Sequence, residues 1–293
     1  MSLVINNNLM AVNAQRNLSK SYGELSSSVR KLSSGLRVGT AADDSAGLAI
    51  RELMRSDIAT TQQGIRNAND AISMIQTADG ALGVIDEKLI RMKELAEQAA
   101  TGTYNSTQRM IIDSEYQAMA SEITRIANAT EFNGIKLLDG SLSGNHDGKK
   151  INSTGAVRIH FGTSNSSAED YYDIKIGGST ASALGLGNTV KGAGATVSTQ
   201  AAAQNALKAI DNAIVSKDKI RAHLGGLQNR LEATVDNLSI QNENLQAAES
   251  RISDIDVSQE MTQFVRNQIL TQTGVAMLSQ ANSLPRMAQQ LIG

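Results

Sequence analysis

Cysteine and tryptophan are both absent from the 293-residue sequence. Without thiols the chain has no disulfides, no thiolate chemistry and no cysteine-ligated zinc site. Only 3% of the residues are aromatic, so a hydrophobic core has to be built from Leu, Ile, Val, Met and Ala. Cores of that kind suit the seams between helices better than they suit thick β-sandwiches.

The sequence also contains a single proline, Pro285. Proline interrupts helices because its ring crowds the preceding turn and its nitrogen carries no hydrogen, so its near absence permits very long helices. We expect the last helix to end at or close to Pro285.

Charge and hydropathy exclude two kinds of partner. The formal net charge is -2 and the basic residues form no cluster, so we expect no binding to nucleic acid. No apolar run reaches the length of about 18 residues that a membrane span needs. The first ten residues, MSLVINNNLM, contain three consecutive asparagines, which exclude the apolar stretch of a cleaved signal peptide.

Glycine divides the chain into three parts. Twelve of the 24 glycines fall between Gly134 and Gly194, whereas both flanks carry regular apolar periodicity. The flanks are therefore predicted to be helical and the middle to be loop and strand. Residues 157–161 and 171–176 alternate in polarity and predict a small β-hairpin. We expect residues 141–199 to form a short, exposed, variable segment.

Three helices are predicted in the N-terminal flank. Between Leu18 and Leu36, apolar residues recur at alternating spacings of four and three, which is the a/d pattern of a coiled coil. After a break, Thr40 or Asp43 is expected to cap a helix of roughly 55 residues, about 80 Å long. After a turn at 101–105, a third helix, capped by Asn105 or Ser106, is expected to pack antiparallel against the second.

The C-terminal flank repeats the coiled-coil pattern. The heptad series runs from Leu224 to Ile252, breaks near Asp254 and Asp256, and resumes in a final helix. Isolated helices of about 30 residues are marginal in water because helical stability comes largely from packing an apolar face. The two terminal helices are therefore expected to pair with each other and with copies of the chain. The residues predicted to carry this self-association are Leu18, Leu25, Val29, Leu32, Leu36, Met261, Phe264, Val275 and Leu278.

Four segments resemble one known family. KLSSGLRVG (31–39) with the following residues 40–50, AESRISDIDVSQEM (248–261) and LSQANSLPRMAQQLIG (278–293) closely resemble the terminal regions of bacterial flagellin. ATEFNGIKLLDG (129–140) is similar to the segment between helix and hairpin in that family. The resemblance implies a mainly α fold: an elongated, hairpin-shaped helical rod with a terminal coiled coil and a small β-hairpin region.

The resemblance also implies which part of the assembly each residue range forms, and what the protein does. Residues 1–43 and 254–293 would form the terminal coiled coil of an inner tube, and residues 44–175 and 200–253 an outer helical rod. The chain would then be a secreted structural subunit that self-assembles into the flagellar filament for motility, after leaving the cell unfolded through the flagellar type III apparatus.

Several protein partners follow from the same resemblance. They are further copies of the chain, an export chaperone, the filament cap, the hook-junction proteins and the host Toll-like receptor for flagellin. Carried over from the family, the receptor contacts would be Arg91, Leu95 and Glu115. From the residues alone, Arg91 and Glu115 on neighbouring helices would form a surface ion pair.

No constellation of catalytic or metal-binding residues stands out. Asp43 and Asp44 are adjacent carboxylates, which we interpret as helix-capping residues. The three histidines, at 146, 160 and 223, have no metal-ligand spacing, so we expect no enzyme, metal or cofactor. Two alternatives remain open: a hook-filament junction protein of the same export system, and a coiled-coil secreted binding module.

Overall fold

The computed structural model describes residues 8–145, 155–164, 166, 169–188, 193–194 and 196–292. Contacts divide the chain into two compact units. We call residues 1–58 with 243–293 the terminal unit and residues 59–242 the central unit. The borders between these units fall inside helices, whereas the predicted domain boundaries fall at the breaks between helices.

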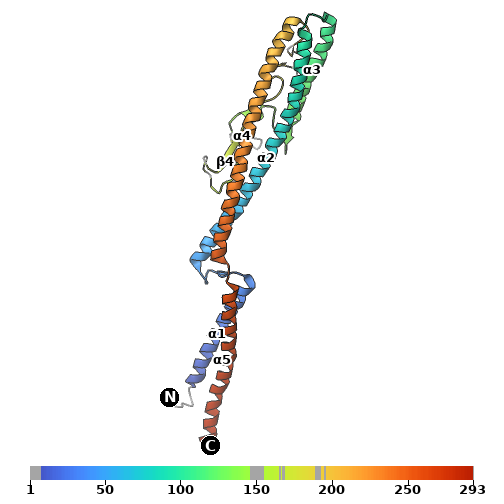
Figure 1. Cartoon of the computed structure of the whole chain (residues 1–293). Coiled ribbons are helices and arrows are strands. Elements are labelled where there is room, and N and C mark those ends of the chain that lie inside the picture. The colour runs from blue at the N-terminus through green and yellow to red at the C-terminus, as the bar shows by residue number, and fades with distance from the viewer. Residues whose placement is uncertain are drawn as a thin grey trace. The chain divides into compact units, whose positions relative to one another are not determined.

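Helices dominate the described part of the chain, and the predicted mainly α fold is confirmed (Figure 1). The described residues form five α-helices: α1 (Leu9–Ser34), α2 (Ser45–Ala100), α3 (Ser106–Ala129), α4 (Gln200–Ser253) and α5 (Val257–Ile292). The short strands of the same residues form three antiparallel pairs: β1 (Glu131–Phe132) with β2 (Ile135–Lys136), β3 (Val157–His160) with β4 (Tyr171–Ile174), and β5 (Gly187–Asn188) with β6 (Ala193–Gly194). One short 3-10 helix lies at Ser141–Ser143.

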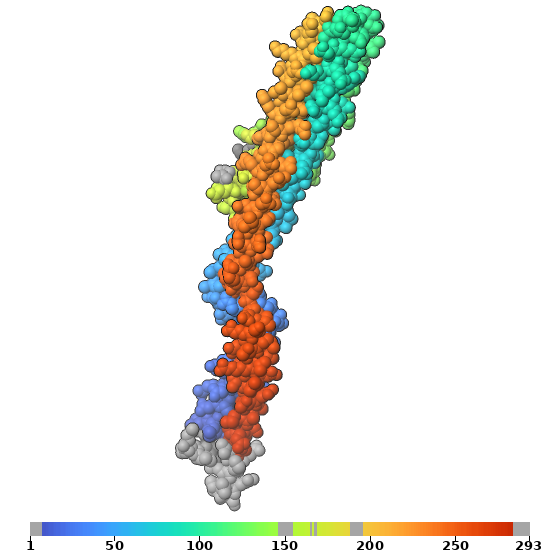
Figure 2. Space-filling model, viewed as in Figure 1, coloured from blue at the N-terminus to red at the C-terminus, as the bar shows by residue number. Residues whose placement is uncertain are grey.

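The core of the central unit lies where α2, α3 and α4 meet, and the side chains of α2 and α4 are in continuous contact in Figure 2. Most of the heptad residues predicted to face inward are buried, although Ile65 and Ile72 of α2 are half-buried. The buried ones from α2 are Ala68, Ile75, Leu82, Ile85, Leu89, Met92 and Ala96. Those from α4 are Leu224, Leu231 and Leu238. Each fully buried leucine or isoleucine contributes about 1.5–3 kcal/mol, so this seam dominates the stability of the central unit.

Three ion pairs join α2 to α4 beside this seam, and one of them links Lys93 to Asp211 at 2.7 Å. Asp79 accepts hydrogen bonds from Arg221 at 2.7 and 3.1 Å, and Asp86 lies 2.6 Å from the buried ammonium of Lys217. As the α2 numbers rise from Asp79 to Asp86, the α4 numbers fall from Arg221 to Lys217. The two helices therefore run antiparallel.

The Asp79–Arg221 pair makes the central unit sensitive to acid. The hydrogen bond from Arg221 lowers the pKa of Asp79 below its ordinary value of 3.8. Because the folded pKa is the lower one, the pair's stabilisation is complete above the ordinary pKa and is lost as the pH falls through the folded pKa. We expect the urea midpoint of the chain to fall less between about pH 7 and pH 3 in Asp79→Asn than in the unchanged chain. An equal fall in both would show that the pair contributes nothing.

The predicted β-hairpin is confirmed by β3 and β4. They pair antiparallel, with Val157 opposite Ile174 and His160 opposite Tyr171. The hairpin rests on α2 at Gly64, where an added Cβ would lie 2.1 Å from the Phe161 carbonyl oxygen. A hydrogen bond of 2.8 Å from Asn67 Nδ2 to the carbonyl of His160 holds the same contact. The missing side chain at residue 64 is thus what allows strand and helix to approach so closely.

The glycine-rich middle is better packed than its composition predicts. Its apolar residues are buried in the same core as the helices: Leu137, Leu138, Leu142, Ile174, Ile176, Ala181, Leu184, Leu186 and Val197. Its backbone is also anchored, since Val197 N–H donates to Asp113 Oδ1 at 2.7 Å and Ser179 N–H donates to the Leu138 carbonyl at 2.8 Å. The prediction that residues 141–199 are exposed is therefore wrong for the buried positions from Leu142 onward, because scattered apolar residues pack individually onto the surface formed by the helices.

The helix starts agree only partly with prediction. Asn105 caps α3 with a complete capping box, in which the side chain of Gln108 returns the hydrogen bond, as predicted for this position. For α2 the predicted cap at Thr40 or Asp43 is wrong, because Asp44 accepts the Gly47 N–H at 2.9 Å. The Asp43 carboxylate instead accepts from the N–H and hydroxyl of Thr40, closing the turn before the helix.

The predicted end of the last helix at Pro285 is also wrong. Helix α5 continues past this residue to Ile292. A proline in a helix interior removes one hydrogen bond, so the helix needs a compensating contact there.

Candidate assembly surface

The two terminal helices lie side by side in the terminal unit, α1 in blue and α5 in red (Figure 1). Asn8 at the start of α1 bonds to Ala281 near the end of α5, with 2.8 Å from Nδ2 to the carbonyl oxygen. At the other end of α1, Leu36 forms an isolated β-bridge with Asp254, just before α5. The helices therefore run antiparallel, as the predicted pairing of the two chain ends requires.

The contact between α1 and α5 is thin. Among the side chains that the structure describes in these two helices, only small or polar ones are buried: Ser28, Asn267, Thr271 and Ala281. The larger apolar residues that face inward, such as Leu25 and Phe264, remain half-buried. At one point the helices come close, since a Cβ on Gly274 would lie 3.0 Å from Leu18 Cδ1. The pair therefore shields its own leucines incompletely.

The outer faces of the same helices expose many large apolar side chains. We call this set the terminal apolar surface; it comprises Leu9, Met10, Val12, Tyr22, Val29, Val257, Met261, Val265, Ile269, Leu270, Val275 and Met277. Leu9 is 68% exposed and Val29 48%. Large exposed apolar patches on a soluble protein mark sites of association, because covering them removes apolar area from water.

The geometry of α5 places the terminal apolar surface on two sides. With 3.6 residues per turn, Met261, Val265 and Ile269 lie on one side of the inward-facing stripe and Leu270 and Met277 on the other. Each pair of terminal helices can therefore be covered by copies on both flanks. Contacts that differ between the two flanks generate an open polymer when the rotation between copies does not close a ring.

The structure divides the nine residues predicted for self-association into two groups. Leu18, Leu25, Leu32, Leu36, Phe264 and Leu278 are half-buried within the terminal unit itself. Val29, Met261 and Val275 are exposed and belong to the terminal apolar surface. The other nine members of that surface were not among the residues predicted for self-association. Tyr22 and Val257 stand at a/d positions, whereas the other seven lie off them, so an apolar residue outside the heptad seam was the available signal for those seven: Leu9, Met10, Val12, Val265, Ile269, Leu270 and Met277.

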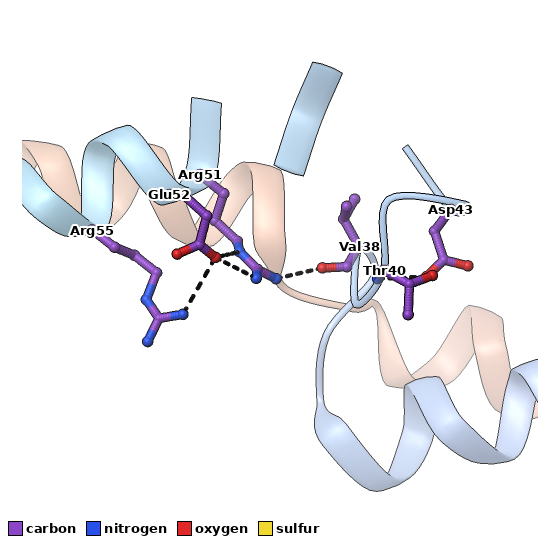
Figure 3. Close-up of polar contacts among 6 residues, drawn as sticks. All are labelled: Val38, Thr40, Asp43, Arg51, Glu52 and Arg55. Atoms are coloured by element: carbon purple, nitrogen blue, oxygen red, sulfur yellow. Dashed lines mark hydrogen bonds and ion pairs between the residues drawn. The ribbon is translucent and has the colours of Figure 1, made fainter. Parts of the chain in front are cut away.

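Polar contacts hold the link between α1 and α2 (Figure 3). The guanidinium of Arg51, only 6% exposed, donates to the carbonyl of Val38 and to the carboxylate of Glu52. The hydrogen bond from Arg51 to the Glu52 carboxylate lowers the pKa of Glu52. Glu52 also lies 3.6 Å from Arg55. Upstream, Arg37 donates to the carbonyl of Ile252 at 2.6 Å. The point where the chain leaves α1 is thus fixed against the chain segment that enters α5.

The residues predicted to contact the innate receptor do not share one surface. Arg91 on α2 and Glu115 on α3 form an exposed ion pair, with 3.0 and 2.8 Å from Nε and Nη2 to Oε1. The hydrogen bond that Arg91 donates to Glu115 raises the pKa of Arg91. Leu95 is only 1% exposed and lies in the central core, so its side chain is not on the surface that carries the two charges.

The part of the chain that the structure describes holds no group of three or more His, Asp or Glu side chains arranged for a metal. Within the same residues, no helix combines the length and the apolar character that crossing a membrane requires. His160 stacks on Tyr171 with 6.3 Å between ring centroids, and His146 lies outside the described residues.

Comparison with known proteins finds family matches to both ends of the chain and relatives that match nearly its whole length. Residues 5–143 match the bacterial flagellin N-terminal helical region, and residues 207–292 match the bacterial flagellin C-terminal helical region. Flagellin FlaB1 of Treponema pallidum (strain Nichols) is 40% identical over 281 residues, which is 96% of this chain and 96% of that protein.

A second relative agrees with this match, and the chain is also similar to a solved structure. The flagellar filament core protein flaB2 of Brachyspira hyodysenteriae is 39% identical over 290 residues, covering 99% of this chain and all of that protein. The crystal structure of Bacillus cereus flagellin has 31% sequence identity and a TM-score of 0.47, covering 63% of this chain and 94% of that one. The family matches at both ends, together with 39–40% identity to these relatives over nearly the whole length, place this chain in the bacterial flagellin family.

Proposed function

We propose that the chain is a structural subunit of the bacterial flagellar filament. It acts outside the cell by polymerising and carries out no catalysis. The observation that carries this proposal is the terminal apolar surface, which flanks the α1–α5 pair on both sides and is left uncovered within one chain. The relatives named flagellin and flagellar filament core protein, at about 40% identity over nearly the whole chain, support the filament subunit over a hook-junction protein.

The roles of the two ends and the middle follow from this proposal. Residues 1–43 and 254–293 form the inner tube of the filament, where further copies cover the terminal apolar surface. Residues 44–175 and 200–253 form the outer rod. The chain travels to the growing end unfolded through the flagellar type III apparatus, with an export chaperone before export and the cap and hook-junction proteins as neighbours in the assembled organelle.

A charge on the terminal apolar surface tests the proposal. Val29 is half-exposed and outside the buried contact, so Val29→Asp is expected to leave the α1–α5 pair folded in the single chain. In the filament the carboxylate would be buried without a partner, which costs several kcal/mol and is expected to raise the critical concentration for polymerisation by at least about a hundredfold. Sedimentation of the purified protein after seeding with filament fragments measures this concentration.

The matched control is Ser19→Asp, which adds the same charge at an exposed polar position of α1. It is expected to polymerise with a critical concentration close to that of the unchanged chain. Leu32→Asp alters the half-buried face instead, and is expected to weaken both the helix pair and assembly. Normal filaments from Val29→Asp would show that this face stays in water.

We further propose recognition by the animal Toll-like receptor for flagellin, with Arg91 and Glu115 as contacts. The exposed ion pair between α2 and α3 supports this role, because its charges remain within reach of a partner. Arg91→Ala is expected to lower receptor signalling by tenfold or more in a reporter-cell assay, since charged interface groups are frequent hot spots. Arg125→Ala removes a comparable exposed arginine, paired with Glu122, and should leave signalling unchanged. Equal responses of the two variants would remove Arg91 from the contact.

A further inference from the structure

Helix α5 passes through a proline without ending. Pro285 lies inside the range Val257–Ile292. Because proline has no N–H, the carbonyl four residues earlier, that of Ala281, loses the hydrogen bond that a continuous helix would give it. A backbone carbonyl shielded from water without a donor is costly, so a helix that continues here needs a donor from elsewhere.

That donor comes from the opposite end of the chain. Asn8 Nδ2 donates to the Ala281 carbonyl at 2.8 Å, a normal hydrogen-bond length, across 273 residues of sequence. The other polar atom of the same amide has a separate task, because Oδ1 accepts the Ala11 N–H at 3.1 Å and caps α1. One side chain thus bonds to two helices: it caps the start of α1, and it donates to the α5 carbonyl that Pro285 leaves without its helical donor.

We propose that Asn8 is the positioning residue that allows α5 to continue through Pro285. Its side-chain amide takes the place of the N–H that proline lacks, so the residues after Pro285 are held in the helix only while the start of α1 is docked. The two ends of the chain then order together. Only one consequence of this proposal rests on the proposed filament function. When a subunit docks α1 during assembly, the last residues of α5 become helical as well.

The residue type at position 8 fits this double task. Asp, Ser and Thr cap a helix about as well as Asn does. An ionised Asp has no hydrogen to donate, and a hydroxyl group offers one donor where the amide offers two together with its own acceptor. Asparagine therefore combines a full capping acceptor with a free donor.

A four-protein comparison tests the proposal by hydrogen exchange on the full chain before polymerisation. The proteins are the unchanged chain, Asn8→Asp, Pro285→Ala and the double variant. Asn8→Asp keeps the cap of α1 and removes only the donor, so amides 286–292 are expected to exchange about tenfold faster. In the Pro285→Ala background the new N–H reaches Ala281 itself, and the same substitution should change exchange by less than about twofold.

Asn13→Asp is the control, since it adds the same charge to the exposed side of α1 and should leave these amides unchanged. An equal effect of Asn8→Asp with and without Pro285 would overturn the proposal, and so would unprotected amides 286–292 in the unchanged chain. Failure of all four proteins to polymerise would count against the filament function alone, because the exchange comparison does not depend on assembly.

Discussion

Deletion of residues 257–293, which removes α5, is expected to abolish polymerisation while the central unit stays folded. The deletion takes away seven of the twelve residues of the terminal apolar surface and the helix that packs along α1. The buried core of the central unit is built from residues between Ala68 and Leu231 and loses none of them. Deletion of residues 1–36 is expected to have the same two effects.

Two measurements separate assembly from folding in these truncated chains. Sedimentation in the presence of filament fragments should find all of the truncated protein in the supernatant, at concentrations where the intact chain pellets. Thermal unfolding followed by circular dichroism should still show a cooperative transition from the central unit. Filament growth by either truncated chain at the normal rate would contradict the assignment of the terminal helices to assembly.

Periodicity predicted the parts of the fold in which one face of an element is buried against one partner. The α2 seam around Ile75 and Leu82 is an example, because apolar residues that recur about every 3.6 positions all lie on one face of a helix. The β3–β4 hairpin followed from alternation for the same reason. The cap at Asn105 was predictable because a capping box involves only residues within one turn.

The parts that could not be predicted depend on contacts between distant residues. Leu142 and Leu186 lie among glycines with no period, and only the surface formed by α2, α3 and α4 gives them a place to be buried. The passage of α5 through Pro285 coincides with a hydrogen bond from Asn8, which no local rule connects to the proline.

The candidate site was predictable in kind and less so in its residues. The heptads indicated that the terminal helices associate, but an a/d pattern does not distinguish a face covered within one chain from a face covered by copies. Leu25 and Val29 stand in the same predicted seam, yet the first is half-buried and the second is exposed. The resemblance to flagellin likewise suggested Leu95 as a surface contact, whereas the packing of α2 places it in the core.

Substitution of two glycines of the same helix by alanine is expected to change stability in opposite directions. Gly80 is exposed on α2, and a Cβ there would meet nothing within 4 Å. Gly80→Ala should therefore raise the free energy of unfolding by about 1 kcal/mol, the difference in helix propensity. Gly64 has the same propensity gain available, but its Cβ would lie 2.1 Å from the Phe161 carbonyl oxygen.

The obstacle at Gly64 is backbone, so it cannot rotate away as a flexible side chain would. Gly64→Ala has to push β3 off α2, which stretches the hydrogen bond from Asn67 to His160 and is expected to lower the free energy of unfolding by about 1–3 kcal/mol. Urea unfolding of the two variants measures the sign, and hydrogen exchange of the β3 and β4 amides locates the change. A Gly64→Ala protein as stable as Gly80→Ala would mean that the hairpin does not rest on α2 at this point, because only that contact separates the two positions.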